Sequence, residues 1–192
     1  GWATVFREEW TDPTLEAWQR YGDPVPAIVS GPGGLPALIN NGDGQFESGV
    51  LSRLRIAGGA GLGLETVIAT PISQPKWQSL RVKFLRSGPI LQSGILTLAS
   101  CGFDIPGGEG AAAMGLARAT SNQLGHEFRA DSVLRTGSWY RLRIQLFPDG
   151  TCGVALDGIP IFRGRAVLDP QHFWNFSLYG QTVGTRMLVG PL

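Results

Sequence analysis

Short apolar segments, many of them alternating with polar residues, follow one another along almost the whole chain, and helical periodicity is nearly absent. Successive side chains of a β-strand point to opposite faces, so a period of two is typical of strands with one buried face. The segments are separated by turn residues, among them many of the 28 glycines and 13 prolines. This pattern predicts an all-β protein, with two antiparallel sheets packed as a β-sandwich and helix limited to short turns.

Fourteen segments are the expected strands: residues 4–7, 27–30, 37–40, 49–56, 63–69, 79–86, 94–100, 112–119, 126–130, 140–147, 152–156, 161–163, 175–179 and 185–189. Asp12-Pro13 combines a helix cap with a proline at the first helical position, which predicts a helical turn or two over residues 12–18. Asp169-Pro170 predicts a second such turn. Two hairpins are expected at Asp149-Gly150 and Asp157-Gly158, because these dipeptides favour tight turns between strands.

The alternation also assigns faces. In the strand near residues 140–147, apolar residues fall on one side and cationic or polar residues on the other, and residues 79–86 repeat the pattern. The expected core includes Leu80, Val82, Phe84, Leu142, Ile144, Leu146, Val154 and Leu156. The opposite faces carry Arg53, Arg55, Arg81, Lys83, Trp139, Arg141 and Arg143. In residues 49–56, we expect Ser52, Leu54 and Ile56 to share a face opposite Arg53 and Arg55.

Composition narrows the class of protein. Apolar residues make up 43% of the chain and charged residues 16%, a balance typical of a compact globular domain. We expect one domain over residues 1–192, belonging to a longer protein. The formal net charge of +1 argues against a nucleic-acid partner. The sequence contains no run of eighteen apolar residues, so this segment is not expected to insert into a membrane.

The two cysteines, Cys101 and Cys152, lie in strand-like segments outside any CxxC pair, far from His126 and His172 in sequence. This spacing does not predict a zinc site, and no metal site is expected. The pattern favours two buried thiols over a disulfide, and both alternatives stay open.

Several motifs together carry a family resemblance. They are residues 40–50, the Gly-Leu-Gly-Leu-Glu strand at 61–65, residues 76–80, the Trp-Tyr-Arg-Leu start at 139–142 with the two Asp-Gly hairpins that follow, and residues 178–185. This order resembles the concanavalin A-like lectin/glucanase superfamily, particularly laminin-G-like and related bacterial jelly-roll domains. The resemblance implies a jelly roll with a concave and a convex sheet. It also implies an extracytoplasmic location, because similar domains often belong to bacterial signalling or cell-surface proteins.

Members of the superfamily bind glycans or proteins, and some hydrolyse glycans with clustered carboxylates on one strand. The nearest group here is Glu127, Arg129 and Asp131. Four residues of strand separate the two carboxylates by about 13 Å, beyond the roughly 5–9.5 Å of glycosidases. No catalytic residue is therefore predicted. Calcium, which related lectins often hold, is not indicated either, because Asn40, Asn41 and Asp43 also suit an ordinary turn.

The expected function is that of a non-catalytic binding or sensing module with a carbohydrate ligand. The alternatives are a glycoside hydrolase of the same superfamily and a structural or protein-interaction domain. The expected ligand-binding residues are Arg55, Lys83, Trp139, Arg141 and Arg143. Arginine forks, a lysine and an aromatic platform suit sugar hydroxyls or uronate groups, but the same residues also suit an exposed, solubilising sheet face.

Overall fold

A computed structural model describes residues 3–4, 6–22, 26–30, 32–40, 48–57, 59–69, 80–91, 94–105, 116–123, 126–133, 139–164, 173–180 and 187–189. Nearly all of the regular structure in these ranges is β-strand, with one short 3-10 turn at Pro32–Gly34. The prediction of an all-β fold is therefore confirmed. No helix in the described ranges is long and apolar enough to cross a membrane.

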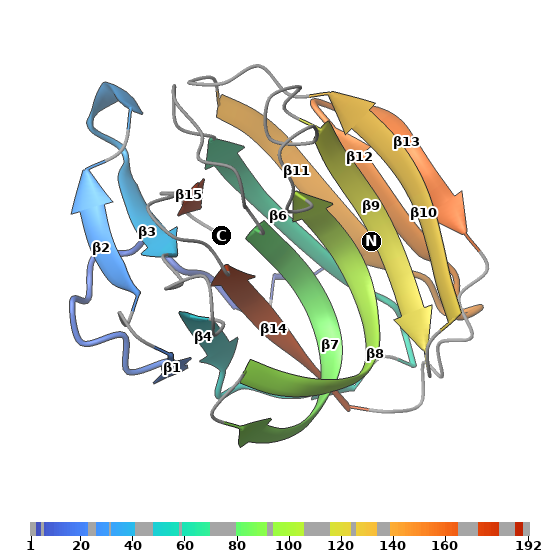
Figure 1. Cartoon of the computed structure of the whole chain (residues 1–192), viewed down its shortest axis with the longest axis horizontal. Helices are drawn as coiled ribbons and strands as arrows, with labels where there is room; N and C mark the ends of the chain where they lie inside the picture. The colour runs from blue at the N-terminus through green and yellow to red at the C-terminus, as the bar shows by residue number, and fades with distance from the viewer. Residues whose placement is uncertain are drawn as a thin grey trace.

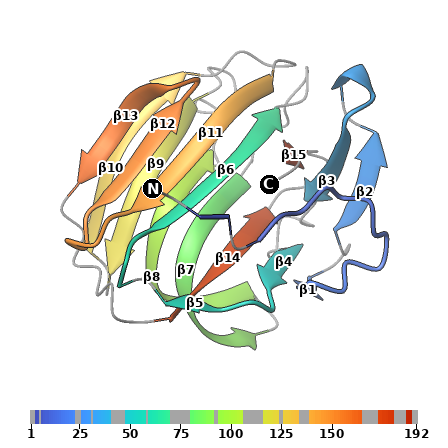
Figure 2. The ribbon, with the colours of Figure 1, turned by 180° about the vertical axis from the view of Figure 1, so that it is seen from behind.

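The strands form two antiparallel sheets that pack as a sandwich. Figure 1 looks onto the eight-stranded sheet, and Figure 2 looks onto the seven-stranded sheet from behind. The eight-stranded sheet has the order β1 (Trp18–Tyr21), β4 (Ser48–Ser52), β14 (Phe173–Gly180), β7 (Leu80–Leu91), β8 (Gly94–Ile105), β9 (Leu116–Gln123) and β10 (His126–Val133), with β5 (Ile56–Ala57) paired to β14. The seven-stranded sheet has the order β13 (Ile159–Gly164), β12 (Cys152–Leu156), β11 (Trp139–Leu146), β6 (Leu62–Ala69), β15 (Met187–Val189), β3 (Pro36–Asn40) and β2 (Ala27–Ser30).

One apolar core fills the space between the sheets, as the alternation predicts. Seven of the eight expected core residues are buried, and the side chain of Leu80 lies outside the described residues. Lys83 is also buried, with 6% of its surface exposed, although its neighbours Val82 and Phe84 belong to the core. The expectation that Lys83 lies on an exposed cationic face of β7 is therefore wrong.

The longest pair of strands, β7 and β8, bends along its length (Figure 1). The register between them shifts around Ser87. Such irregularities bend a sheet and increase its local twist.

The N-terminal segment departs from the sequence expectations. Residues 4, 6 and 7 are not in a strand, and residues 12–17 form turns rather than a helix. The Asp12 carboxylate accepts bonds from the backbone N–H groups of Thr14 and Glu16, while Leu15 has a positive φ of 54° that ends any helical run. Trp18 then begins β1, a strand that the sequence does not reveal.

Glu8 holds this segment to the core. Its carboxylate accepts a bond from the Trp18 indole N–H at 2.8 Å and from the Trp10 backbone N–H at 2.7 Å. The Trp10 and Trp18 rings lie 5.5 Å apart, and both side chains are 1% exposed. The segment before β1 thus extends the core beyond the two sheets.

The single strand expected at residues 49–56 is divided. β4 ends at Ser52, where the Arg53 backbone N–H donates to the Ala17 carbonyl at 2.9 Å and Arg53 Nε donates to the Glu16 carbonyl at 3.0 Å. The chain leaves the sheet to make these bonds, so Leu54 is exposed rather than buried with Ser52.

Both expected hairpins are present. Gly150 lies in the turn between β11 and β12 with a φ of 80°. Asp157 and Gly158 form the two-residue turn between β12 and β13, with φ values of 51° and 81°. Two successive positive φ angles are typical of a type I′ turn, which explains the Asp-Gly pair.

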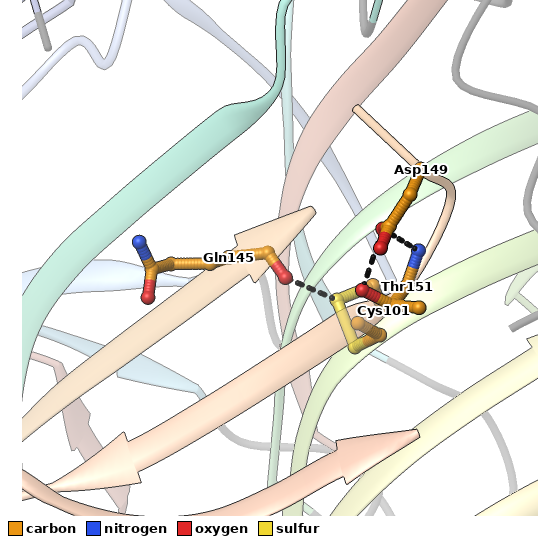
Figure 3. Close-up of a disulfide and its surroundings, with 5 residues drawn as sticks. Cys101, Gln145, Asp149 and Thr151 are labelled. Carbon is orange, nitrogen blue, oxygen red and sulfur yellow. Dashed lines mark hydrogen bonds between the residues drawn. A yellow bond between two sulfur atoms is a disulfide. The ribbon is translucent and has the colours of Figure 1, made fainter. Parts of the chain in front are cut away.

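Cys101 and Cys152 form a disulfide (Figure 3), so the preference for two free thiols is wrong. Both residues are fully buried, as expected, but they come from different sheets, β8 and β12. Their Cα atoms lie 5.6 Å apart across a sequence separation of 51 residues. Only the packing of one sheet against the other creates this proximity, which neither strand reveals by itself.

Candidate functional site

Polar residues gather in rows on the face of the eight-stranded sheet that is opposite to the core. Because Val82, Phe84, Cys101 and Phe103 belong to the core, strand alternation places the residues between them on this opposite face. The register of neighbouring strands defines three rows on this face. The middle row is Gln19, Leu51, Ser177, Lys83, Gly102, Thr120 and Arg129. One flanking row is Tyr21, Gly49, Tyr179, Arg81, Asp104, Arg118 and Asp131, and the other is Asn175, Leu85, Ser100, Asn122 and Glu127. We call these rows the Lys83 face.

Lys83 lies low on this face. A Cβ atom added to its neighbour Gly102 would lie 2.5 Å from Lys83 Cγ and 2.4 Å from the Val82 carbonyl oxygen. The aliphatic stem of Lys83 therefore occupies the space that a side chain at position 102 would need. Ser100, two residues earlier on the same face, is 1% exposed. The centre of the Lys83 face is thus a covered polar floor rather than a set of solvated side chains.

The five expected ligand-binding residues do not share one sheet. Lys83 lies on β7, and Arg55 is exposed in the link between β4 and β5. Trp139, Arg141 and Arg143 lie on β11, in the other sheet. One groove that contains all five is therefore excluded, because the outer faces of two packed sheets look in opposite directions. The alternation on each strand is visible in the sequence, but the assignment of strands to sheets is not.

The outward face of β11 has its own polar contacts, and we call it the Arg143 face. Arg143 and Glu65 form an exposed ion pair in which Nε donates to Oε1 at 2.6 Å. The Arg141 backbone N–H donates to the Asp157 carboxylate at 2.8 Å, while the Arg141 side chain is exposed. Trp139 is half-buried at the start of the strand. Exposed pairs of this kind add little stability and suit a solvated surface.

The Asp149 carboxylate lies in the turn after β11 and accepts two hydrogen bonds there. Asp149 accepts bonds from the Thr151 hydroxyl at 2.7 Å and from the Thr151 backbone N–H at 2.9 Å (Figure 3). These bonds to the charged form, the hydroxyl first, hold the pKa of Asp149 below its ordinary value of 3.8. The pKa of Asp12 is lowered in the same way by Thr14. Both carboxylates stabilise turns rather than forming a reactive centre.

The register also places two acidic residues from different strands, Asp104 and Asp131, in one row, which the pattern of a single strand cannot reveal. Glu127 and Asp131 lie on β10, at the edge of the sheet, and Asp131 shares a row with Asp104 of β8. Two strand spacings correspond to about 10 Å between the backbones of Asp104 and Asp131. Arg118 lies between them in the row, an order that also fits a ladder of cross-strand ion pairs.

The residues that the structure describes do not form a cluster of metal ligands. No group of three or more His, Cys, Asp or Glu residues is placed there to hold a metal ion. Of the considered calcium ligands, Asn40 pairs with Met187 in the sheet, whereas Asn41 and Asp43 lie outside the described residues.

The fold is similar to that of known carbohydrate-related proteins. The carbohydrate recognition domain of Emp47p matches with a TM-score of 0.70 and 10% identity, over 100% of this chain and 97% of that chain. The carbohydrate-binding module CBM66 from Bacillus subtilis matches with a TM-score of 0.56 and 12% identity, over 91% and 92% of the two chains. A glycoside hydrolase family 16 endo-glucanase from Bacteroides ovatus matches with a TM-score of 0.67 and 8% identity, over 98% and 100%.

No protein-family model and no curated protein sequence matches the chain. At 7–14% identity, the structural matches establish the fold and not the activity. The chain has the fold of the concanavalin A-like lectin/glucanase superfamily.

Proposed function

We propose that this chain is a non-catalytic carbohydrate-binding module and that it binds its ligand on the Lys83 face. The observation that carries the proposal is the register of the eight-stranded sheet. It aligns hydroxyl, amide and charged residues over five neighbouring strands, around the covered floor of Lys83, Gly102 and Ser100. Ligand sites orient their ligands with a small number of polar groups held in fixed positions, and a continuous sheet can hold groups in this way. Carbohydrate-binding domains among the structural matches support the same assignment.

The disulfide supports an extracytoplasmic location. Disulfides persist in oxidising compartments and are rare in the cytosol, where thiols are kept reduced. The buried Cys101–Cys152 bond fits a domain that folds outside the cytoplasm. We propose that this domain serves a longer bacterial surface or periplasmic protein as its glycan-binding or sensing part.

A glycan array on the purified domain, followed by titration calorimetry with each positive glycan, tests the proposal. We expect binding that Thr120→Val and Asn122→Leu weaken, because both changes remove hydrogen-bonding groups from rows of the Lys83 face. A domain that binds no glycan on the array would contradict the proposed function.

The Arg143 face is the alternative site that the sequence suggests, with Trp139, Arg141 and Arg143 as contacts. Its residues are the matched controls, because they lie on the outer face of the other sheet. We expect Arg141→Ala and Arg143→Ala to leave glycan affinity unchanged. Loss of binding in these two variants alone would move the site to the Arg143 face.

A second candidate function is glycan hydrolysis, which the match to an endo-glucanase and the shared row of Asp104 and Asp131 favour. A reducing-sugar assay on every bound polysaccharide separates the two functions. We expect no release of reducing ends. Turnover that Asp131→Asn abolishes, with binding retained, would establish the enzyme instead.

A further inference from the structure

The segment before β1 is irregular, yet it contains some of the most buried side chains of the described residues. Residues 6–17 form no strand or helix and follow an irregular path that ends at β1 (Figure 2). Trp10 is 1% exposed and Leu15 is 2% exposed, and both belong to the core. The segment is therefore held to the sandwich by buried side chains and not by the backbone ladder of a strand. We call residues 6–17 the clasp.

Both buried residues of the clasp adopt a backbone conformation that costs free energy. Trp10 and Leu15 each have a φ of 54°, in the left-handed region that residues with large side chains rarely enter. Such strain persists only where the surrounding contacts outweigh it. Here the same two side chains supply those contacts, because their burial in the core stabilises the docked clasp. Opening the clasp therefore relieves the strain and loses the contacts together.

Three residues of the clasp converge on Trp18, the first residue of β1. The rings of Phe6 and Trp10 lie 5.6 Å and 5.5 Å from the Trp18 ring. The Glu8 carboxylate accepts the Trp18 indole N–H at 2.8 Å and the Trp10 backbone N–H at 2.7 Å. Because these contacts share one side chain and one carboxylate, the loss of one weakens the others, and the clasp docks or opens as a whole.

The strand β1 depends on the docked clasp. It has four residues, lies at the end of the eight-stranded sheet and pairs with β4. Trp18 is its residue in the core, so an open clasp removes the packing partners of the anchor of this short strand. The chain after β4 is tied to the same unit, because the Arg53 backbone N–H donates to the Ala17 carbonyl at 2.9 Å.

We infer that the clasp and β1 form one conformational unit that opens and closes while the rest of the sandwich stays folded. Proteins open locally in cooperative units whose free energies lie below that of global unfolding. The register places Gln19 and Tyr21 of β1 in rows of the Lys83 face, so opening removes this edge from that face. The unit thus sets how far the face extends, whichever ligand the face binds.

Hydrogen exchange of backbone amides tests the inference without a ligand. The reporter amides are those of Trp18, which donates to the Leu15 carbonyl, and Arg53, which donates to the Ala17 carbonyl. The reference amides are the protected ones of β11, a strand paired on both sides. We expect both reporter amides to exchange with one common opening free energy and about tenfold or more faster than the reference amides. Reporter and reference amides that share one opening free energy would overturn the inference.

A variant outside the unit separates local opening from global unfolding. Gly158→Ala strains the β12–β13 hairpin, which stays folded whether the clasp is docked or open. We expect it to accelerate exchange of the β11 amides about fivefold and to leave the reporter amides unchanged. Equal acceleration of reporter and reference amides would show that the clasp opens only when the whole domain unfolds.

A pair of neighbouring variants tests the contact that holds the clasp. Glu8→Gln turns an amide N–H₂ group toward the N–H of Trp10 or Trp18, so it should accelerate exchange of the reporter amides about tenfold. Glu9→Gln is the matched control, because Glu9 pairs with the exposed Arg7 side chain, and it should change nothing. Protection of the β11 amides verifies that each variant is folded. Reporter amides that exchange equally in the two variants would overturn the assigned role of Glu8 and with it the clasp.

Discussion

Asp149 illustrates how single residues in this chain stabilise turns through charge. Its carboxylate is exposed and receives two bonds from Thr151, which lower its pKa below 3.8. A group whose pKa is lowered by folding stabilises the folded state when it is ionised. The contribution is complete above the ordinary pKa and is lost as the pH falls through the lower pKa of the folded state.

We therefore expect Asp149→Asn to lower the free energy of unfolding, by an amount that stays constant between pH 7 and about pH 5. Below about pH 4 the difference from the unmodified protein should shrink, because the carboxyl group becomes neutral in both states. Urea unfolding across this pH range measures the difference. Thr151→Val removes the main cause of the lowered pKa and should show the same trend. A difference that persists unchanged at pH 2 would contradict the assignment.

At the scale of elements, the β12–β13 hairpin depends on backbone conformations that few residues adopt. Gly158 has a φ of 81°, and an added Cβ would meet no atom within 4 Å. Any loss of stability at this position therefore comes from backbone strain and not from a clash. Asp157 tolerates its own positive φ because short polar side chains are accepted there, and its carboxylate also accepts the Arg141 N–H.

Gly158→Ala should lower the free energy of unfolding by about 1 kcal/mol, the usual cost of a left-handed conformation for a residue with a Cβ atom. Gly158→Asn is the matched variant, because asparagine enters this conformation more easily and should cost less. Chemical denaturation of both variants measures the order. Equal losses in the two variants would show that strain at φ 81° is not the cause.

For the whole molecule, the disulfide is the one cross-link through side chains between the two sheets among the described residues. It closes a loop of 51 residues between β8 and β12. By the chain-entropy relation, a loop of this length restricts the unfolded state enough to stabilise the fold by about 4 kcal/mol.

We expect Cys101→Ala with Cys152→Ala to lower the free energy of unfolding by about 4 kcal/mol. Either single substitution already breaks the link, so each should cost nearly as much as the pair. Denaturation with and without dithiothreitol provides the control, since the double variant should not respond to the reductant. Single substitutions that each cost half of the total would indicate lost packing and not a lost cross-link.

The sequence predicts the candidate site only in part. Arg55, Trp139, Arg141 and Arg143 do lie outside the core, because alternation along a strand is a local property. Their separation onto two sides of the molecule, the low position of Lys83 over Gly102 and the row shared by Asp104 and Asp131 depend on which strands are neighbours. Neighbouring strands can be distant in the chain, as β14 between β4 and β7 shows.

The sequence by itself determined the fold class, most of the strands, both Asp-Gly hairpins and seven described core residues. These features follow from local periodicity and from the backbone preferences of glycine and aspartate. Only the tertiary structure decided the order of the strands, the Cys101–Cys152 disulfide, the strand at Trp18 and the break at Arg53. Each of these depends on contacts between residues far apart in the chain, whose free energies outweigh the local preferences from which a sequence is interpreted.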